Sequence, residues 1–530
     1  MENEANSHKH VVPSKEKFGR ADPLLVIVVV IAALTRFSGL SHPREVYFDE
    51  TYYANDAVVY LEGREAFRDN LDARYGGTSR ASQIVPVGAV PGEISWVHPP
   101  LGKWAIAIGI ILFGKQPLGW RALPATFGTV AVGLVFVIAW LLWEKRSWAF
   151  LAALMVAVDG LEITMSRVAM LDIFAATFML ASFACLLAER HRLTRMRQSL
   201  LTSTSGVTDG QGIYPDPTGS IHSYPRQNPD EPWDAVYQDL EYSQDFEYSV
   251  QWRDESPRSS LGSKRYLALS GVLMGLALAS KLNALFAWVI VVVFALVWYV
   301  QLRAPTTRAS DAIMNCLPRV LTLLVFVPAL VYVISFTRFY VDNAAGSIGK
   351  NPLGTLSEFV KLQVNTVKYH STMRQDHPYK SSPQSWPLMW RPIAFWYHDY
   401  QNGMRGHILA VGNPVLWWSY LLCFPALLGL IVAKRRWQDI FVLAGYAGQY
   451  LPWFASSRTA FFYYMLPVVP FMALTIVSVV GSLRKRVRQA VFMGLGSAAL
   501  LAGIAFYPIW TGIPIAESIW SRLMLFRSWI

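Results

Sequence analysis

The chain contains few charged residues and few cysteines for its length. Only 16% of its 530 residues are charged, whereas 53% are hydrophobic. Soluble domains are much less apolar, and about a quarter of their residues are charged. The three cysteines lie in or beside apolar runs without metal-ligand spacing, at Cys185, Cys316 and Cys423. Neither a disulfide framework nor a zinc site is therefore supported, and the composition indicates a membrane protein with several crossings.

The basic residues are concentrated in short clusters between the apolar runs. A net charge of +11 would suit nucleic-acid binding only if Lys and Arg formed a stripe along one surface, and no such stripe is present in the sequence. Cytoplasmic loops of membrane proteins are enriched in Lys and Arg in this clustered way. We therefore expect contact with the lipid bilayer and no nucleic-acid partner.

A crossing of about 30 Å of hydrocarbon needs about 20 helical residues, which predicts eleven transmembrane helices. We expect them at 23–40, 119–143, 147–163, 172–189, 266–281, 283–302, 318–339, 415–432, 437–455, 460–481 and 490–508. The apolar segment 104–114 is shorter and is bracketed by Lys103 and Lys115, so we predict a surface or re-entrant helix there. Every strong basic cluster then becomes cytoplasmic, as the positive-inside rule requires.

The predicted crossings divide the chain into membrane and soluble parts. These are an N-terminal cytoplasmic tail 1–22, a membrane module 23–189 with an outer loop 41–118, a cytoplasmic stretch 198–263, central helices 264–339, a second outer loop 340–414, C-terminal helices 415–508 and an outer tail 509–530. The stretch 198–263 is rich in Ser, Pro, Gly, Asp and Gln without an apolar period, so we predict that it is disordered. The first apolar run has no small-residue cleavage site after it, so it is expected to remain as a helix.

Eight ionisable residues fall on the outer side of this predicted topology, in loops or at helix ends. They are Asp49, Glu50, His98, Lys103, Arg121, Arg167, Asp172 and Lys281. Each one has a structural explanation when taken singly, such as a solvated carboxylate, a rigid His-Pro-Pro turn, a snorkelling cation or an ion pair between Arg167 and Asp172. Their common placement nevertheless indicates a site at the membrane surface.

Several short motifs occur in an order that resembles the protein O-mannosyltransferase family. They are Phe48-Asp49-Glu50-Thr51-Tyr52-Tyr53, His98-Pro99-Pro100-Leu101-Gly102-Lys103, Gly119-Trp120-Arg121, Ser166-Arg167-Val168-Ala169-Met170-Leu171-Asp172, Gly275-Leu276-Ala277-Leu278-Ala279-Ser280-Lys281, Ser385-Trp386-Pro387 with Arg391-Pro392, and Gly412-Asn413-Pro414-Val415. The acidic pair also occurs in other glycosyltransferases that use lipid-phosphate sugars, whereas the Ser-Trp-Pro and Gly-Asn-Pro-Val pair is more discriminating. The resemblance covers nearly the whole chain and implies an all-α polytopic membrane protein of the GT-C glycosyltransferase fold.

The resemblance also implies an activity. Such enzymes take mannose from polyprenyl-phosphate mannose and attach it, with inversion, to Ser or Thr hydroxyls of secreted or membrane proteins, and the export translocon is a further expected partner. Eukaryotic relatives carry a β-trefoil domain in the long outer loop, and the 340–414 segment is too short for one. This departure points to the bacterial branch, and thus to a plasma-membrane enzyme with its active site on the extracytoplasmic face. No metal and no other cofactor is expected.

The expected reaction gives the motif residues their roles. An inverting displacement needs a base for the hydroxyl proton, and the family pattern implies Asp49 for it, with Glu50 shaping the site or contacting the acceptor. The leaving lipid phosphate is stable as an anion, so it needs cations and not the second carboxylic acid of a glycosidase. Arg121, Arg167 and Lys281 are the expected cations.

The remaining site residues have less defined expected roles. His98 and Lys103 open the short helix and are expected to support the donor headgroup, although a purely structural turn explains His98 equally well. Asp172 is expected to orient Arg167 or to contact the sugar. Trp386 and Arg391 in the second outer loop have the aromatic and cationic character that suits an acceptor peptide or a sugar face, and loop packing explains them equally well.

Two other functions stay open from the sequence. A related enzyme would move another sugar, such as arabinose or aminoarabinose, from polyprenyl phosphate to a glycan or a lipid. A lipid-sugar flippase would carry ionisable residues near the middle of the bilayer and a matching pair of broken helices. This chain places most ionisable residues at the ends of its predicted crossings, which favours an enzyme.

Overall fold

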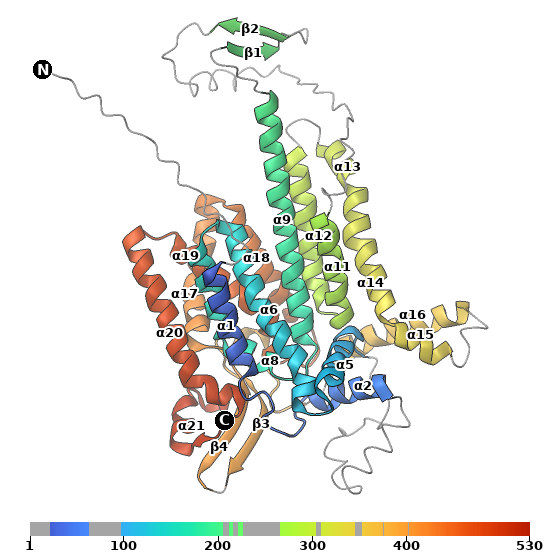
Figure 1. Cartoon of the computed structure of the whole chain (residues 1–530), viewed down its shortest axis with the longest axis vertical. Helices are drawn as coiled ribbons and strands as arrows, with labels where there is room; N and C mark the ends of the chain where they lie inside the picture. Colours follow the sequence, from blue (N-terminus) through green and yellow to red (C-terminus); the bar gives the residue numbers. More distant parts are fainter. Residues whose placement is uncertain are drawn as a thin grey trace, which may run out of the picture.

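The computed structural model describes residues 22–62, 97–204, 211–215, 221–225, 265–303, 309–344, 352–374, 376–400 and 402–530. The described residues form a bundle of long helices, with several short helices and a small sheet gathered at one end (Figure 1). That end holds α2 (Glu50–Glu62), α5 (Leu101–Phe113) and α16 (Pro352–Thr372), all from segments that the sequence places on the outer side. The predicted tail 1–22 lies outside the described residues, apart from Asp22.

The helices follow the apolar runs of the sequence. The N-terminal half of the bundle contains α1 (Pro23–Phe37), α6 (Pro117–Trp143), α7 (Arg146–Ala157), α8 (Gly160–Ser166) and α9 (Asp172–Thr204). The central part contains α11 (Arg265–Ser280), α12 (Ala284–Arg303), α13 (Ala309–Leu321), a π-helical turn (Thr322–Phe326), α14 (Val327–Ser335) and α15 (Thr337–Ala344). The C-terminal part contains α17 (Pro414–Lys434), α18 (Trp437–Tyr450), α19 (Val469–Gly481), α20 (Lys485–Thr511) and α21 (Glu517–Leu523).

The number of membrane crossings differs from the sequence prediction. Among the described residues, seven helices are long and apolar enough to cross a membrane, and the bent pair α7 and α8 adds an eighth if it forms one span. The apolar helices α1 and α11 have only 15 and 16 residues, so they are too short to count as crossings by helix length alone. The predicted count of eleven is therefore not confirmed. The segment predicted as a short surface helix is α5, with 13 residues.

The bend between α7 and α8 is stabilised by Asp159, which lies within the predicted crossing 147–163. The two helices meet at 62°, and the Asp159 carboxylate accepts hydrogen bonds from the backbone N–H of Glu162 and Asn413 and from Nε1 of Trp417. Asn413 belongs to the Gly-Asn-Pro-Val motif, and its side chain in turn donates to the backbone carbonyls of Val158, at the break, and of Ala499 in α20. This part of the motif is therefore structural, because it joins α17 to the break.

The centre of the bundle is formed by α9 and by the segment that leads into α19. In the apolar stretch of α9, 78% of the residues are buried inside the protein, and in Phe462–Gly481 the share is 89%, whereas the stretches in α17 and α20 reach only 22%. The outer ends of these two central helices begin at Asp172 and at the 3-10 helix Phe462–Val468. Side chains at these ends are held by packing on all sides, which is what a preorganised site requires.

Two predictions about the segment after the fourth crossing are corrected by the structure. The helix predicted over 172–189 continues to Thr204, because its polar extension is rich in Arg and Leu, which favour helix without a membrane. Within the stretch predicted as disordered, 198–263, the strands β1 (Gln211–Pro215) and β2 (Ile221–Pro225) pair as an antiparallel hairpin. The other residues of that stretch beyond Thr204 lie outside the described residues.

A three-stranded antiparallel sheet lies at the end of the bundle that also holds α2 and α5 (Figure 1). It consists of β3 (Ile393–Tyr400), β4 (Met404–Ala410) and the short β5 (Ile515–Ala516), in the order β3-β4-β5. Gly403 closes the β3–β4 turn at a φ of +74°, which suits a residue without a side chain. The second outer loop therefore contains a hairpin that the sequence did not predict.

Candidate active site

Glu50 and Arg121 form a buried ion pair that joins the start of α2 to α6. Nε and one terminal nitrogen of Arg121 each donate to Glu50 at 2.8 Å, and both side chains are 0% exposed. The second terminal nitrogen donates to the carbonyls of Leu40 and Pro43, and the first also donates to the carbonyl of Glu45. All five N–H donors of the guanidinium are therefore occupied.

This geometry argues against the phosphate contact expected for Arg121, because binding a phosphate oxygen requires an N–H that is still available. The Glu50 carboxylate is likewise occupied by hydrogen bonds within the protein, because Trp120 donates its indole N–H and Ala169 its backbone N–H to it as well. The pair instead fixes the 40–50 segment against α6 and the 166–171 loop. Glu50 acts as the anchor for Asp49, and an acceptor contact by its own carboxylate is not supported.

Arg167 binds the end of α1. One of its terminal nitrogens donates to the carbonyls of Arg36 and Ser38, both at 2.8 Å, and the other donates to Gly39 at 3.1 Å. The last carbonyls of a helix have no intrahelical partner, so an Arg at this place caps them. The ion pair with Asp172 that the sequence left open is not formed. The expected phosphate role of Arg167 is also weakened, because the side chain is only 4% exposed.

Asp172 instead pairs with Lys281, which lies in the turn after α11. Nζ of Lys281 is 2.7 Å from Oδ2 of Asp172, and the side chains are 11% and 3% exposed. The ammonium group also lies over the rings of Tyr463 and Tyr464, with 5.8 and 6.0 Å to the ring centroids. Two predicted site residues from distant motifs thus meet at the outer ends of α9 and α11.

Asp49 interacts electrostatically with both residues of this pair. It precedes α2 directly, and burial raises the pKa of its carboxyl from the ordinary value to about 6, opposed by the positive charge of Lys281 and reinforced by the negative charge of Asp172. A carboxyl group with a pKa near the working pH is suited to accept a proton. Asp49, Asp172 and Lys281 therefore interact electrostatically, and this group is the candidate reaction centre.

Lys103 connects two short outer helices. Its ammonium is 2.8 Å from Asp56 of α2, and the Lys103 side chain is fully buried in α5. The pair holds α5 against α2, so Lys103 is not presented to a donor headgroup as expected. His98, in the turn before α5, is only partly buried, but its Nδ1 atom is buried and has no hydrogen-bond partner among the described residues.

A second basic group at this end of the bundle contains two residues that the motifs did not indicate, His370 of α16 and Arg458. The His370 ring lies 4.9 Å from that of His98, and its Nε2 bonds the carbonyl of Val97 at 2.6 Å. Its Nδ1 faces a guanidinium N–H of Arg458 at 3.1 Å, which assigns the neutral Nε2–H tautomer. Burial lowers the pKa of His370, and burial with the charge of Lys281 lowers that of His98.

Arg458 is the cation of this group whose hydrogen-bond donors are not all in use. Its side chain is partly exposed, and Nε has no hydrogen-bond partner among the described residues. The guanidinium also lies over Tyr464, the ring that Lys281 contacts as well. One signal could have identified it: a short Ser-Ser-Arg-Thr segment between the predicted crossings 437–455 and 460–481 places an Arg on the outer side, against the usual charge bias.

Trp386 and Arg391 hold the second outer loop in place. Trp386 is 1% exposed, and its indole N–H donates to Ser381, so its burial argues against the expected contact with an acceptor. Arg391 donates to the carbonyls of Pro378 and Ser528 and thereby ties the loop to the C-terminal segment. The Ser-Trp-Pro and Arg-Pro motif is therefore explained by packing.

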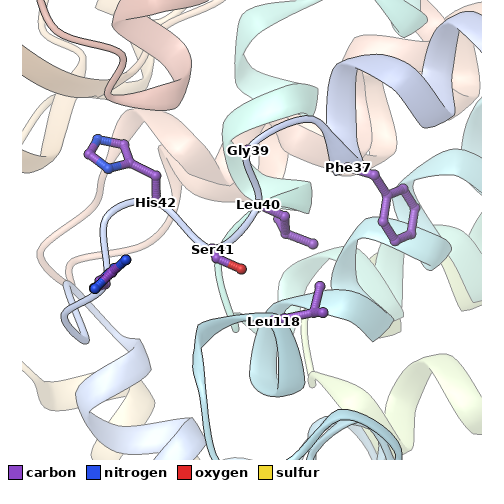
Figure 2. A pocket seen from close by; sticks show the side chains of 7 residues that line it. Phe37, Gly39, Leu40, Ser41, His42 and Leu118 are labelled. Atoms are coloured by element: carbon purple, nitrogen blue, oxygen red, sulfur yellow. The ribbon is translucent and has the colours of Figure 1, made fainter.

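An open pocket of about 390 Å³ lies where α1 ends and α6 begins. Figure 2 shows Phe37 and Leu118 on one side of it and His42 on the other. It is lined by Phe37, Gly39, Leu40, Ser41, His42, Arg44 and Leu118. None of these side chains belongs to the group around Asp49, so the pocket does not define the reaction centre.

Comparison with solved structures identifies the fold. The yeast protein O-mannosyltransferase Pmt1-Pmt2 complex bound to the sugar donor matches with a TM-score of 0.67 and 14% identity, over 95% of this chain and 92% of that one. ArnT from Cupriavidus metallidurans bound to undecaprenyl phosphate matches with a TM-score of 0.50 and 15% identity, over 91% and 69%. The protein is thus an α-helical, multi-pass membrane protein with the GT-C glycosyltransferase fold.

Sequence relationships are more specific. Residues 118–214 match the family described as dolichyl-phosphate-mannose-protein mannosyltransferase, and residues 355–529 match the C-terminal four-transmembrane region of protein O-mannosyltransferases. The polyprenol-phosphate-mannose–protein mannosyltransferase of Mycolicibacterium smegmatis is 26% identical, over 96% of this chain and 92% of the relative. That of Corynebacterium glutamicum is 25% identical, over 98% and 95%. The chain belongs to the protein O-mannosyltransferase family.

Proposed function

We propose that this chain transfers mannose from polyprenyl-phosphate mannose to Ser and Thr hydroxyls of exported proteins, with inversion at the sugar carbon. The observation that carries the proposal is the raised pKa of Asp49 beside the Asp172–Lys281 pair, in a chain whose full-length relatives are named for this activity. One base with neighbouring cations suits a displacement in which a phosphate leaves as an anion.

In the proposed reaction Asp49 accepts the proton of the acceptor hydroxyl as its oxygen attacks the anomeric carbon. The bond from that carbon to the phosphate oxygen breaks, and the electron pair stays on the lipid phosphate. Lys281 and Arg458 supply positive charge at the Tyr464 side of the site, which stabilises the departing phosphate. These cations take the role of a metal, so we propose transfer without a metal or another cofactor.

The direct test is transfer of labelled mannose from polyprenyl-phosphate mannose to a peptide with a single Thr, using the purified full-length chain. Label in the peptide, at equal rates with and without a chelator, is expected. Label found only in lipid or glycan would favour the related enzyme class that moves sugars to those acceptors, and the proposed function would then be wrong.

The proposed setting is the bacterial plasma membrane, with the reaction centre on the extracytoplasmic face. The full-length relatives from Mycolicibacterium and Corynebacterium are bacterial, and the end of the bundle with Asp49 is the one that the distribution of Lys and Arg puts outside. Acceptors would meet the site there after leaving the export translocon. The polytopic fold keeps the lipid donor in the same bilayer.

The pH dependence of transfer is expected to follow the ionisation of Asp49. Below its pKa of about 6 the protonated carboxyl cannot accept a proton, so kcat/KM should fall about tenfold per pH unit. Asp172→Asn removes a negative charge that raises this pKa, so the midpoint should move to lower pH. Lys281→Met removes a positive charge that lowers it, so the midpoint should move to higher pH. Shifts of the same sign in kcat/KM profiles would contradict the assignment.

Arg458→Gln is expected to raise the KM for the lipid donor by about tenfold or more, the size of a lost charge-assisted hydrogen bond. The KM for the acceptor peptide should change little. Arg522, exposed on α21, provides the control, because Arg522→Gln removes the same charge from another part of the outer surface. An increase in peptide KM alone would place Arg458 on the acceptor side.

A further inference from the structure

The strand β3 is an edge strand whose outer half is exposed. Among the strands that the structure describes, the order β3-β4-β5 pairs β3 with β4 on one side and leaves its other edge without a partner strand. Tyr397 is 46% exposed, and the next residues, His398 and Asp399, are exposed as well. An unpaired edge presents a row of backbone N–H and C=O groups, which is a template for an extended peptide.

The inner half of the same strand reaches the residue beside Asp49. The pairing passes from Ala394 with Leu409 to Trp396 with Ile408, so Phe395 is the extra residue of a β-bulge. The Phe395 ring stacks on Phe48 with 4.0 Å between the centroids, and Phe48 is the direct neighbour of Asp49. Bulges redirect side chains and are frequent next to active sites.

The hairpin is held in a fixed position. The indole N–H of Trp396 donates to Glu45, in the segment that Arg121 anchors. The rings of Trp396 and His398 are parallel, and that of Tyr400 follows edge-on at 4.4 Å. A strand braced in this way, with one end at the reaction centre, keeps a constant relation between its open edge and Asp49.

We propose that the open edge of β3 binds the acceptor polypeptide as an added β-strand, which brings the Ser or Thr that receives the sugar alongside the Phe395 bulge. This inference rests on the proposed function. Neighbouring strands lie about 4.8 Å apart, so a hydroxyl at that position would lie close to the Phe48–Asp49 segment. Main-chain hydrogen bonds supply the affinity in this binding mode, so one site would accept many different acceptor sequences.

The test is a scan in which single backbone N–H groups of a Thr-containing peptide are replaced by ester oxygen. In an added strand, alternate residues turn their N–H toward the protein, so the effect should alternate along the peptide. At positions of one parity the peptide KM should rise about 2- to 12-fold, the range for one hydrogen bond, with kcat little changed. Equal effects at neighbouring positions, or none, would overturn the proposal.

A second measurement tests the register directly. Opposed residues of paired strands have Cβ atoms about 4.5–5.5 Å apart, closest at non-hydrogen-bonded positions, so a small adjustment brings two cysteines there to the roughly 3.5–4.5 Å of a disulfide. In the test protein, the native cysteines are replaced by Ser and Asp399 by Cys. Under mild oxidation, it should form a disulfide only with peptides whose Cys lies at one particular number of residues from the Thr. Ser521→Cys, exposed on α21, is the control and should show no preferred offset.

The outcomes separate this proposal from the proposed function. If labelled mannose never reaches the peptide, the proposed function fails. If mannose is transferred but the ester effects do not alternate and Asp399→Cys shows no preferred offset, the acceptor binds elsewhere and only the β3 proposal is wrong.

Discussion

Asp49→Asn is expected to lower kcat for mannose transfer by about 10²- to 10⁴-fold, the usual contribution of a general base. Asparagine has nearly the same shape but cannot take the hydroxyl proton at any pH in the working range. The side chain is partly accessible and is not one of the fully buried anchors, so the fold should tolerate the change. The acid limb of the pH profile, which follows the Asp49 pKa of about 6, should disappear with it.

The measurement is single-turnover transfer from labelled polyprenyl-phosphate mannose to a Thr peptide, together with equilibrium binding of the donor. Donor binding should persist in Asp49→Asn. Asp376→Asn is the matched control, because Asp376 is an exposed carboxylate in the second outer loop with Lys380 as its partner. A rate within a few-fold of the native protein for Asp49→Asn, or an equal loss in the control, would remove Asp49 from the role of base.

Part of this site could be predicted from the sequence because short motifs carry chemistry that requires particular residue types. Asp49, Asp172 and Lys281 come from three motifs, and the charge distribution along the sequence places all three on one side of the membrane. The structure brings Asp172 and Lys281 to 2.7 Å and couples both to Asp49. Residues at the outer ends of central helices were thus predictable as a group.

The individual roles of the cations could not be predicted, because a sequence does not say how many hydrogen-bond donors of an arginine are already in use. Arg121 uses all five on Glu50 and backbone carbonyls, and Arg167 caps α1. Arg458 and His370 belong to no recognised motif and meet only through tertiary packing. The motifs therefore contain residues with a structural role, such as Arg121 and Arg167, as well as residues that could bind the substrate.

The fold was predictable where length and apolar character agree, as in α6, α17 and α20. It was not predictable where local interactions break or extend a helix, because the length of an apolar run does not show them. Asp159 breaks one crossing into α7 and α8 with a 62° bend, and the polar extension of α9 stays helical beyond the predicted crossing. The β3–β4 hairpin depends on a tight turn at Gly403 and on contacts with the C-terminal segment, which are remote in sequence.

Loss of either partner of the Glu50–Arg121 pair is expected to destabilise the protein strongly. Both side chains are fully buried, and removal of one leaves an uncompensated charge, which costs about 3–5 kcal/mol. Arg121→Ala should therefore lower the apparent Tm in detergent, and Arg121→Lys should not rescue it, because a lysine cannot reproduce the planar array of donors.

The exposed pair Glu358–Lys361 provides the control for this prediction. Its atoms are 2.7 Å apart, close to the 2.8 Å of the Glu50–Arg121 pair, but the side chains are 57% and 64% exposed, and such a pair contributes about 0–1 kcal/mol. Lys361→Ala should leave the Tm nearly unchanged. The double variant Glu50→Ala with Arg121→Ala should lose less than the sum of the two single losses, since neither charge remains unpaired. If Arg121→Ala kept the native Tm and raised only the donor KM, Arg121 would be a phosphate ligand, and the anchoring role of the pair would be wrong.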